Sequence, residues 1–323
     1  MNNFKHLTRR AFWLGIYGYA IGTLALLGLH LLVGEGWDAV AVLNGFLHLL
    51  LLPAFIGVIC TAYTRRWIAT LLFLPTIVML IVWYGAFFIP RAQSAPNDAP
   101  TLSVMTYNIW IGDFDHLADK AEMLLASDVD IIAVQEIDTD SAEYLADALA
   151  EAYPYQAVHH FPLSSLGQGV FSRYPILDDE FWRLYRGQQR VTVDVNGIDV
   201  VIYNLRGHPP LRADRVEGRT REVTSWLERF EAEDANTPML IVGDFNMTDR
   251  SDDYWRIVEH YHDAFHEVGF GFGWTFNGTF PIPLLRIDYV FHNDAVQALT
   301  ARVLVNSGGS DHNPLVVEVA LQG

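Results

Sequence analysis

The stretch VTVDVNGIDVVIY, residues 191–203, contains two runs of alternating apolar residues separated by Asn196 and Gly197. An Asn-Gly pair between such runs is the strongest short-range signal for a β-hairpin, because both residues tolerate the positive φ angles of a type I′ turn. The stretch therefore predicts an antiparallel strand pair and disfavours a purely parallel, doubly wound sheet.

The chain around this hairpin alternates short β-rich runs with amphipathic segments of helical period. Strands are predicted at residues 102–107, 131–135, 169–172, 191–195, 200–204, 239–242, 287–292, 301–305 and 315–320. Helices are predicted at residues 116–126, 141–150, 211–230 and 252–259. Hairpins combined with βα units predict an α/β sandwich of two sheets.

Polar residues of one chemical kind follow or begin several of these strands. They are Asn108, Glu136, His208, Asp244, Asn246, Asp288, Asp311 and His312. Each alone has an ordinary explanation as a turn or capping residue. Together they predict a site, because the strand edges of α/β folds are where such residues gather.

The residue types in this set restrict the chemistry. Carboxylate and amide oxygens are hard ligands that suit Mg²⁺, with Mn²⁺ as an alternative. The single cysteine, Cys60, lies in the apolar first third of the chain, and no HxxxH pair occurs, so a zinc protease site is disfavoured. A hard metal ion with histidines, Asp and Asn can hydrolyse a phosphate ester.

Five short motifs, TYNIW, VQEID, GDFN, RIDYVF and SDHNP, occur in this order between residues 106 and 314. In order and spacing they resemble the endonuclease/exonuclease/phosphatase superfamily of metal-dependent phosphoesterases. The resemblance covers about residues 101–321. It implies a four-layer sandwich of two mixed β-sheets flanked by helices.

The resemblance also implies a role for each polar residue. Glu136 would be the principal metal ligand, with Asn108 beside it and Asp311 across the site. Asp244 would orient or deprotonate the attacking water, and Asn246 would hold a phosphate oxygen.

Two histidines complete the implied site. His312 would contact the scissile phosphate, and Asp288 would fix its tautomer and raise its basicity. His208 would be the second histidine and would stabilise the pentacovalent oxyanion. The sequence departs from the family here, because LRG separates Asn204 from His208, whereas the family commonly has its histidine directly after the strand. Asn204 and Arg206 are therefore alternatives that share this role.

The first third of the chain is apolar. Three segments, about residues 11–33, 40–63 and 68–89, contain no Asp, Glu, Lys or Arg and are long enough to cross a bilayer. We therefore expect an all-α membrane region with three transmembrane helices at 1–92, a tether at 93–100, and a catalytic domain at 101–323. A re-entrant or buried hairpin is the alternative to three spans.

The positive residues predict an orientation. Lys5, Arg9 and Arg10 precede the first span, and Arg65 and Arg66 lie between the second and third. By the positive-inside rule, the N-terminus faces the cytoplasm. Three spans then place the catalytic domain on the extracytoplasmic side of the membrane, which we expect to be the plasma membrane.

Charge bears on the substrate. Residues 1–98 hold 6 of the 21 Lys and Arg and 3 of the 38 Asp and Glu, so residues 99–323 carry a formal charge of −20. This charge opposes nucleic-acid binding, although arginines after His208 offer a local basic edge. A phosphorylated substrate linked to membrane lipids, such as a phospholipid or a polyprenyl phosphate, is favoured. A nuclease and a catalytically inactive binding domain are the alternatives, and no protein partner is predicted.

Overall fold

The computed structural model describes the chain except for residues 1, 97–98, 112–114, 210–212, 279 and 323. The chain divides into two compact units. One comprises residues 1–89 with residues 250–252, and the other comprises residues 90–249 with residues 253–323.

The first unit is helical. Its elements are α1 (Asn2–Val33), α2 (Asp38–Gly45), α3 (Leu47–Leu51), α4 (Ala54–Tyr63), α5 (Trp67–Tyr84) and the 3₁₀ helix η1 (Gly85–Phe88). Two stretches, Lys5–Val33 and Trp67–Phe88, are long and apolar enough to cross a membrane. Ala39–Gly45 and Leu47–Tyr63 reach that length only as a pair, and this pair is bent by 78°. The helices thus offer two to three candidate spans.

Small residues and hydroxyl groups join these helices to one another. A Cβ added at Gly57 of α4 would lie 2.7 Å from the ring of Phe73 in α5, so the two helices approach closely there. Between α5 and α1, Thr76 Oγ1 donates a hydrogen bond to Thr23 Oγ1 over 3.1 Å. Many large apolar side chains of α1 and α5 are exposed instead. Small residues inside and apolar residues outside are the pattern of helices packed in lipid.

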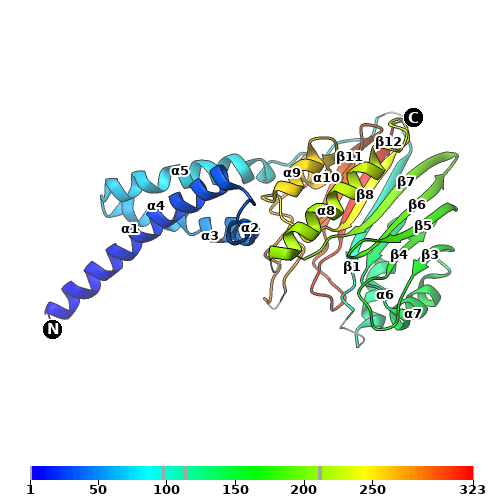
Figure 1. Ribbon diagram of the computed structural model, residues 1–323, viewed down its shortest axis with the longest axis horizontal. Helices are drawn as coiled ribbons and strands as arrows, with labels where there is room; N and C mark the ends of the chain where they lie inside the picture. Colours follow the sequence, from blue (N-terminus) through cyan, green and yellow to red (C-terminus); the bar gives the residue numbers. More distant parts are fainter. Residues whose placement is uncertain (1, 97–98, 112–114, 210–212, 279, 323) are drawn as a thin grey trace. The chain divides into compact units, whose positions relative to one another are not determined.

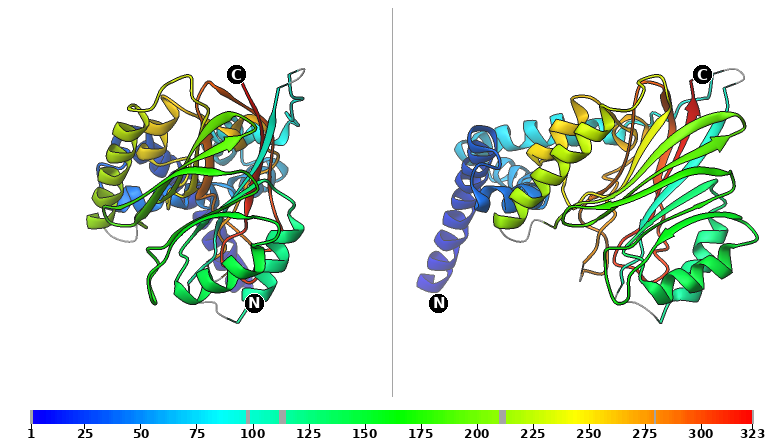
Figure 2. Two further views of the ribbon diagram at one scale, coloured as in Figure 1. Left: turned by 90° about the vertical axis from the view of Figure 1, so that its right-hand side faces the viewer. Right: turned by 45° about the vertical axis from the view of Figure 1, so that its right-hand side comes forward.

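The second unit is built on two six-stranded sheets (Figure 1, with further views in Figure 2). One has the order β11-β12-β1-β2-β4-β3 and the other β5-β6-β7-β8-β10-β9. Both sheets are mixed, because β1 runs parallel to β2 and β7 parallel to β8. The strands are β1 (Thr101–Asn108), β2 (Ile131–Gln135), β3 (Tyr155–His159), β4 (Gln168–Ser172), β5 (Ile176–Arg183), β6 (Gly187–Val195), β7 (Ile198–Arg206), β8 (Met239–Asp244), β9 (His262–Asp263), β10 (Asp288–His292), β11 (Val296–Val303) and β12 (Leu315–Leu321).

Helices cover the outer face of each sheet. The helices α6 (Leu117–Ala126) and α7 (Thr139–Leu149) share a buried apolar cluster with β1 and β2. On the other sheet, α8 (Ala213–Phe230) and α9 (Asp252–Val258) share a cluster with β7 and β8. A third cluster fills the space between the sheets and includes residues of α10 (Ala264–Val268). This is the predicted four-layer sandwich of two mixed sheets flanked by helices, and the predicted fold class is confirmed.

The predicted hairpin joins β6 and β7. Val195 pairs with Ile198, and Asn196 and Gly197 have φ angles of 56° and 91°. The Asp194 carboxylate accepts a hydrogen bond from Gly197 N–H at 2.6 Å, which closes the turn. The hairpin is therefore formed by the turn residues from which it was predicted.

Three strands were not predicted, β3, β5 and the two-residue β9, and each lies at the edge of its sheet. Residues 177–180 of β5 are exposed, so neither face of the strand requires alternating apolar residues. An edge strand of this kind carries a weak periodic signal. The predicted helix at 211–230 begins outside the described residues, and its described part is α8.

Candidate active site

Alternation along the strands aims polar side chains into the space between the two sheets. Val104 of β1 and Val242 of β8 lie in the core between the sheets, and Asn108 and Asp244 share their faces. On β10, Asp288 is the direct register partner of Asp244. All three polar residues are buried. A period of two therefore brings polar side chains from three strands to one end of the sandwich.

The chain turns sharply where β2 and β8 end. Glu136 and Asn246 have φ angles of 61° and 51°, a left-handed conformation that non-glycine residues adopt infrequently. Just before this turn, Gly243 has a φ of 143°, and a Cβ at that position would lie 1.9 Å from Leu205 O. Such conformations are uncommon and cluster at functional sites. They give Glu136 and Asn246 directions that strand alternation does not provide.

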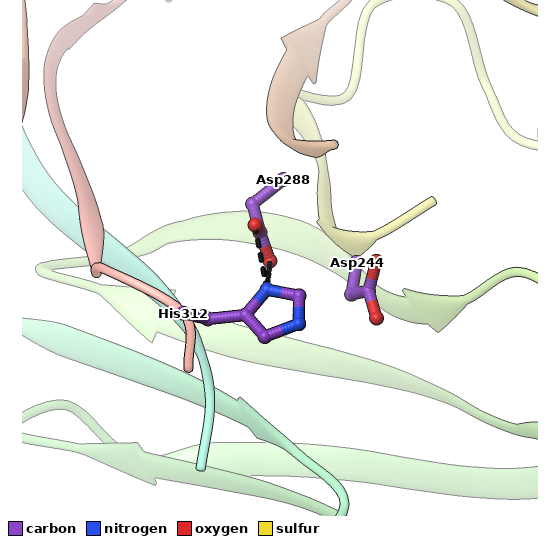
Figure 3. Close-up of side chains that lie close together, drawn as sticks. All are labelled: Asp244, Asp288 and His312. Atoms are coloured by element: carbon purple, nitrogen blue, oxygen red, sulfur yellow. Dashed lines mark hydrogen bonds and ion pairs between the residues drawn. The ribbon is translucent and has the colours of Figure 1, made fainter. Parts of the chain in front are cut away.

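His312 is held by a carboxylate and by an aromatic ring. Its Nδ1 lies 2.9 and 3.2 Å from the two carboxylate oxygens of Asp288, a geometry in which the ring N–H donates to the carboxylate (Figure 3). The His312 backbone N–H donates to Ser310 Oγ at 3.1 Å. The Phe276 ring centroid lies 4.8 Å from that of the imidazole. These contacts fix the ring and leave Nε2 for other partners.

Asp244 lies beside this pair, and the electrostatics of the three residues are linked. Asp244, Asp288 and His312 each offer a ligand atom within 4.8 Å of the others. Burial raises the pKa of Asp244 to about 6, although the charge of His312 opposes the rise. Burial alone would lower the pKa of His312, but the charges of Asp288, Asp244 and Asp311 outweigh it and raise that pKa to about 10. At neutral pH an imidazolium therefore lies among carboxylates.

Asn108 connects this group to a second one. Its Nδ2 donates to Glu136 Oε1 and to Asp244 Oδ2, each at 3.0 Å. Glu136 Oε1 also forms an ion pair with Arg206 Nη2. Arg206 Nε lies 3.7 Å from Asp244 Oδ2. Contributions from both sheets thus form one buried network of charges.

Asn246 and Asp311 lie at the margin of this network. Asn246 Nδ2 donates to Asp244 Oδ2 at 2.8 Å and to Gly207 O at 3.1 Å. Asp311 Oδ1 is 4.0 Å from His312 Nε2, and burial raises the pKa of Asp311. The network therefore brings together all the predicted site residues except His208.

His208 makes different contacts. Its ring stacks on Tyr185 at 5.6 Å between centroids and 12° between planes. Its backbone N–H donates to Glu222 Oε2 at 2.8 Å. Of the two alternatives for its role, Asn204 donates to Val134 O within the core, and Arg206 contacts Glu136. The assignment of His208 as the second catalytic histidine stays a prediction.

The signal for Arg206 lies in the strand itself. β7 extends to Arg206, two residues beyond the end predicted from the sequence. Val200, Ile202 and Asn204 face the other sheet, and Arg206 continues this alternation. Strand parity alone could therefore have placed Arg206 in the site.

Comparison with known proteins agrees with this geometry. Residues 105–312, well over half of the chain, match the endonuclease/exonuclease/phosphatase family. The chain belongs to this family. As a member of the endonuclease/exonuclease/phosphatase family, it has the fold of metal-dependent phosphoesterases. No curated protein sequence matches it.

Solved structures of similar fold cover this unit. An endonuclease/exonuclease/phosphatase from Beutenbergia cavernae DSM 12333 is 27% identical, with a TM-score of 0.60, over 69% of this chain and 72% of that one. TDP2 from D. rerio, complexed with a single strand DNA product, is 17% identical with a TM-score of 0.57, over 68% of this chain and 98% of that one. A functionally unknown protein from Enterococcus faecalis V583 is 19% identical with a TM-score of 0.58, over 68% and 100%.

The endonuclease/exonuclease/phosphatase family generally uses divalent metal ions, and the donors in this chain fit one. Asp244, Asp288 and His312 form a candidate metal site with two hard oxygen donors and an imidazole. Within the part of the chain that the structure describes, the buried Asp311 Oδ1 has no hydrogen-bond partner. Carboxylates outnumber the cationic groups around them, so a dication would lower the repulsion among the acids.

Proposed function

We propose that this protein is a membrane-anchored phosphoesterase that hydrolyses a phosphate ester or pyrophosphate of a lipid-linked substrate. The observation that carries the proposal is the presence, in one chain, of a phosphoesterase site and two to three apolar helices long enough to span a bilayer. A membrane anchor raises the effective concentration of substrates that lie in the same membrane. Phospholipids and polyprenyl phosphates or pyrophosphates are such substrates.

In the proposed mechanism, Asp244 accepts a proton from the attacking water. A pKa of about 6 leaves this carboxylate ionised at neutral pH and still basic enough for general-base catalysis. Asn246 Nδ2 keeps its hydrogen bond to Asp244 and donates to a phosphate oxygen in place of Gly207 O. The His312 imidazolium, oriented by Asp288, donates to the scissile phosphate.

In this scheme Glu136, Asn108 and Asp311 would hold Mg²⁺ or Mn²⁺, because a protonated His312 has no lone pair to offer a metal ion. When bound, the ion would neutralise phosphate oxygens during in-line displacement. The Asn108 amide carries one donor and one acceptor end, and its Oδ1 accepts from Trp110 N–H at 3.0 Å. Rotating this amide by half a turn would present its oxygen to the ion.

Loops that contact the site residues also carry exposed apolar side chains, which supports a lipid-linked substrate. Trp110 is 41% exposed and contacts Asn108 through its backbone. Leu163 is 81% exposed, and its loop contributes Ser165 O to a hydrogen bond from Arg206 Nη1. Phe280, 58% exposed, lies in the loop that begins at Phe276. Apolar groups near a phosphate site suit a substrate with a hydrocarbon chain.

A nuclease is the second candidate, and the structure of D. rerio TDP2 with a single strand DNA product is the observation that favours it. Charge opposes it in this chain. Two arginines of the expected basic edge are ion-paired, since Arg219 Nε lies 3.1 Å from Asp253 and Arg221 Nη2 lies 2.5 Å from Glu217. Paired arginines contribute less to phosphate binding than free ones.

A substrate comparison separates the two candidates. The full chain in detergent micelles with Mg²⁺ is incubated with a polyprenyl pyrophosphate, with a phospholipid and with supercoiled plasmid. We expect phosphate or headgroup release that EDTA and Asp244→Ala both abolish, and no plasmid nicking. Nicking lost in Asp244→Ala, without lipid hydrolysis, would favour the nuclease.

The proposal includes an orientation, with a cytoplasmic N-terminus and an extracytoplasmic catalytic domain in the plasma membrane. The positive residues in the N-terminal turns of α1 (Lys5, Arg9 and Arg10) and between α4 and α5 (Arg65 and Arg66) support it. Protease added to intact spheroplasts should cleave the catalytic domain and spare an N-terminal tag. Protection of the domain until the membrane is permeabilised would refute the orientation.

A further inference from the structure

We propose that Arg206 is a built-in cation of the active site that pairs with Glu136 in the free enzyme. It releases that carboxylate to the divalent ion and then binds the nonbridging oxygens of the substrate phosphoryl group. The inference deepens the proposed function and rests on it, because it assigns a group that recognises the phosphate. It also gives to Arg206 the position for which the sequence suggested His208.

The first step is the position of Arg206. It is the last residue of β7, and its register partner on the parallel strand β8 is Asp244. Its side chain is buried, with 6% of the residue exposed, and its guanidinium is paired with Glu136. A guanidinium buried between two carboxylates at a strand end is part of the site and not a surface charge.

The second step is the way the backbone of Arg206 is fixed. Gln188 of β6 holds it from both sides, since its Oε1 accepts from Arg206 N–H at 3.0 Å and its Nε2 donates to Arg206 O at 2.8 Å. The next residue, Gly207, donates its N–H to Asp244 O at 2.8 Å. A Cβ on Gly207 would lie 2.2 Å from Phe245 O. The backbone at the end of β7 is therefore held in one conformation, which keeps Arg206 close to Asp244.

The third step concerns the hydrogen bonds of the guanidinium. Nη2 bonds to Glu136 and Nη1 donates to Ser165 O at 3.0 Å. Among the described residues, the buried Nε has no hydrogen-bond partner and faces Asp244 at 3.7 Å. A buried donor without an acceptor is unfavourable. A phosphoryl oxygen would supply that acceptor, and the forked guanidinium matches the geometry of phosphate.

The fourth step is the charge balance. Four carboxylates lie around two basic side chains: Glu136 and Asp244 around Arg206, and Asp288 and Asp311 around His312. His312 is already bonded to Asp288, so Arg206 is the group that neutralises Glu136. A dication bound to Glu136 would take over this task. The guanidinium, no longer paired with Glu136, would then bind an incoming anion.

Removal of Arg206 should therefore move two measurements in opposite directions. Arg206→Gln leaves Glu136 without its cation, so Mn²⁺ should bind the full chain in micelles about tenfold more tightly, because competition for the carboxylate is lost. Inorganic phosphate should bind the Mn²⁺-loaded variant at least tenfold more weakly. Mn²⁺ binding is followed by electron paramagnetic resonance without substrate, and phosphate binding by calorimetry.

Two further variants complete the test. Arg206→Lys keeps the charge and loses the fork, so Mn²⁺ affinity should stay near that of the wild type while phosphate binding falls. If Arg206→Gln does not fold, the phosphate affinity of Arg206→Lys tests the inference by itself. Arg221→Gln, which removes an exposed arginine paired with Glu217, is the matched control and should change neither value.

Unchanged or weaker Mn²⁺ binding in Arg206→Gln, or unchanged phosphate binding in both Arg206 variants, would overturn the inference. The proposed function fails separately, if the wild-type chain releases no phosphate from any lipid-linked substrate. The Mn²⁺ titrations do not depend on that result, so the two failures can be told apart.

Discussion

Two buried polar regions lie within the catalytic sandwich, and they differ in chemistry. Between the sheets, Gln135 Nε2 donates to Thr106 Oγ1 and to Asn204 Oδ1, and Asn204 Nδ2 donates to Val134 O and Gly169 O. All of these groups are neutral, and the amides bond to one another and to backbone carbonyls. Two residues further along β1 and β7, the network around Asp244 and His312 consists mainly of charged groups.

The difference separates a structural polar network from a catalytic one. Neutral amides whose N–H groups find partners inside the protein join two sheets at low cost, although Gln135 Oε1 has no hydrogen-bond partner among the described residues. In the charged network, burial raises the pKa of Asp244, so its carboxylate is less stable there than in water. The surrounding carboxylates raise the pKa of His312, so its imidazolium is more stable there than in water. The residues of both regions are buried, so shifted pKa values identify the catalytic site better than burial does.

The largest effect should follow from neutralising Asp244. Asp244→Asn removes the proposed base and should lower the hydrolysis rate by about 10³-fold. It should also leave thermal stability unchanged or slightly raised, because a buried, repelled carboxylate is lost. Rates and melting temperatures of the full chain in micelles test both.

Asp234→Asn is the matched control, since Asp234 lies in an exposed turn and bonds to Asn236. A strong loss of stability in Asp244→Asn, comparable to that of a core variant, would assign Asp244 to the structural class.

Asp288→Asn should have the next largest effect. Asp288 is the first of the charges that raise the pKa of His312 to about 10, so the imidazolium of the variant should lose its proton at lower pH. We expect a rate loss of about 10²-fold and an alkaline limb of the pH–rate profile that moves to lower pH. An unmoved alkaline limb would show that the protonation of His312 does not limit the reaction.

Asn204→Ala should lower stability and leave the hydrolysis rate nearly unchanged, the reverse of what we expect for Asp244→Asn. It removes one acceptor of Gln135 Nε2 and the side-chain donor to two backbone carbonyls, at a cost of about 2 kcal/mol, which corresponds to a fall in melting temperature of about 4–8 °C. The rate for each folded molecule should stay within about twofold. A rate loss as large as that of Asp288→Asn would remove the distinction between the two regions.

The sequence predicted the two-sheet fold and most of the site for one reason, the period of two along the strands. Asn108, Asp244 and Asp288 lie on the inward faces that contain the core residues Val104, Val242 and others. Glu136 does not follow from this alternation, because its φ of 61° redirects the chain after β2. Its place in the site was predicted from its position directly after a strand, and its role as a metal ligand came from the resemblance.

The residue at the end of β7 was harder to predict, because it depended on where that strand ends. The predicted strand stopped at Asn204, which left Arg206 and His208 as residues of a loop. β7 in fact continues to Arg206, and its backbone bonds to Gln188 complete the strand. Side-chain contacts between neighbouring strands, such as those of Gln188 with Arg206, are not visible in a local sequence pattern.

Glu222 combines features of the two regions. It is ionisable like the residues of the charged network, and it is hydrogen-bonded to backbone like the neutral amides. Its carboxylate accepts N–H groups of Arg186 and His208 at 2.9 and 2.8 Å. Burial raises its pKa to about 7, although these hydrogen bonds oppose the rise. A raised folded-state pKa means that the associated stability is complete below the unfolded value, near 4.5, and is lost as pH rises through about 7.

Glu222→Gln should therefore change the slope of stability against pH. Between pH 5.5 and 7.5, the stability of the wild type should fall relative to the variant by about 1–2 kcal/mol, as melting temperatures measured in parallel would show. Any constant offset between the two proteins reports only lost hydrogen bonds. A difference that stays constant across this range would place Glu222 with the neutral amides, because its carboxylate would then be fully satisfied by the backbone.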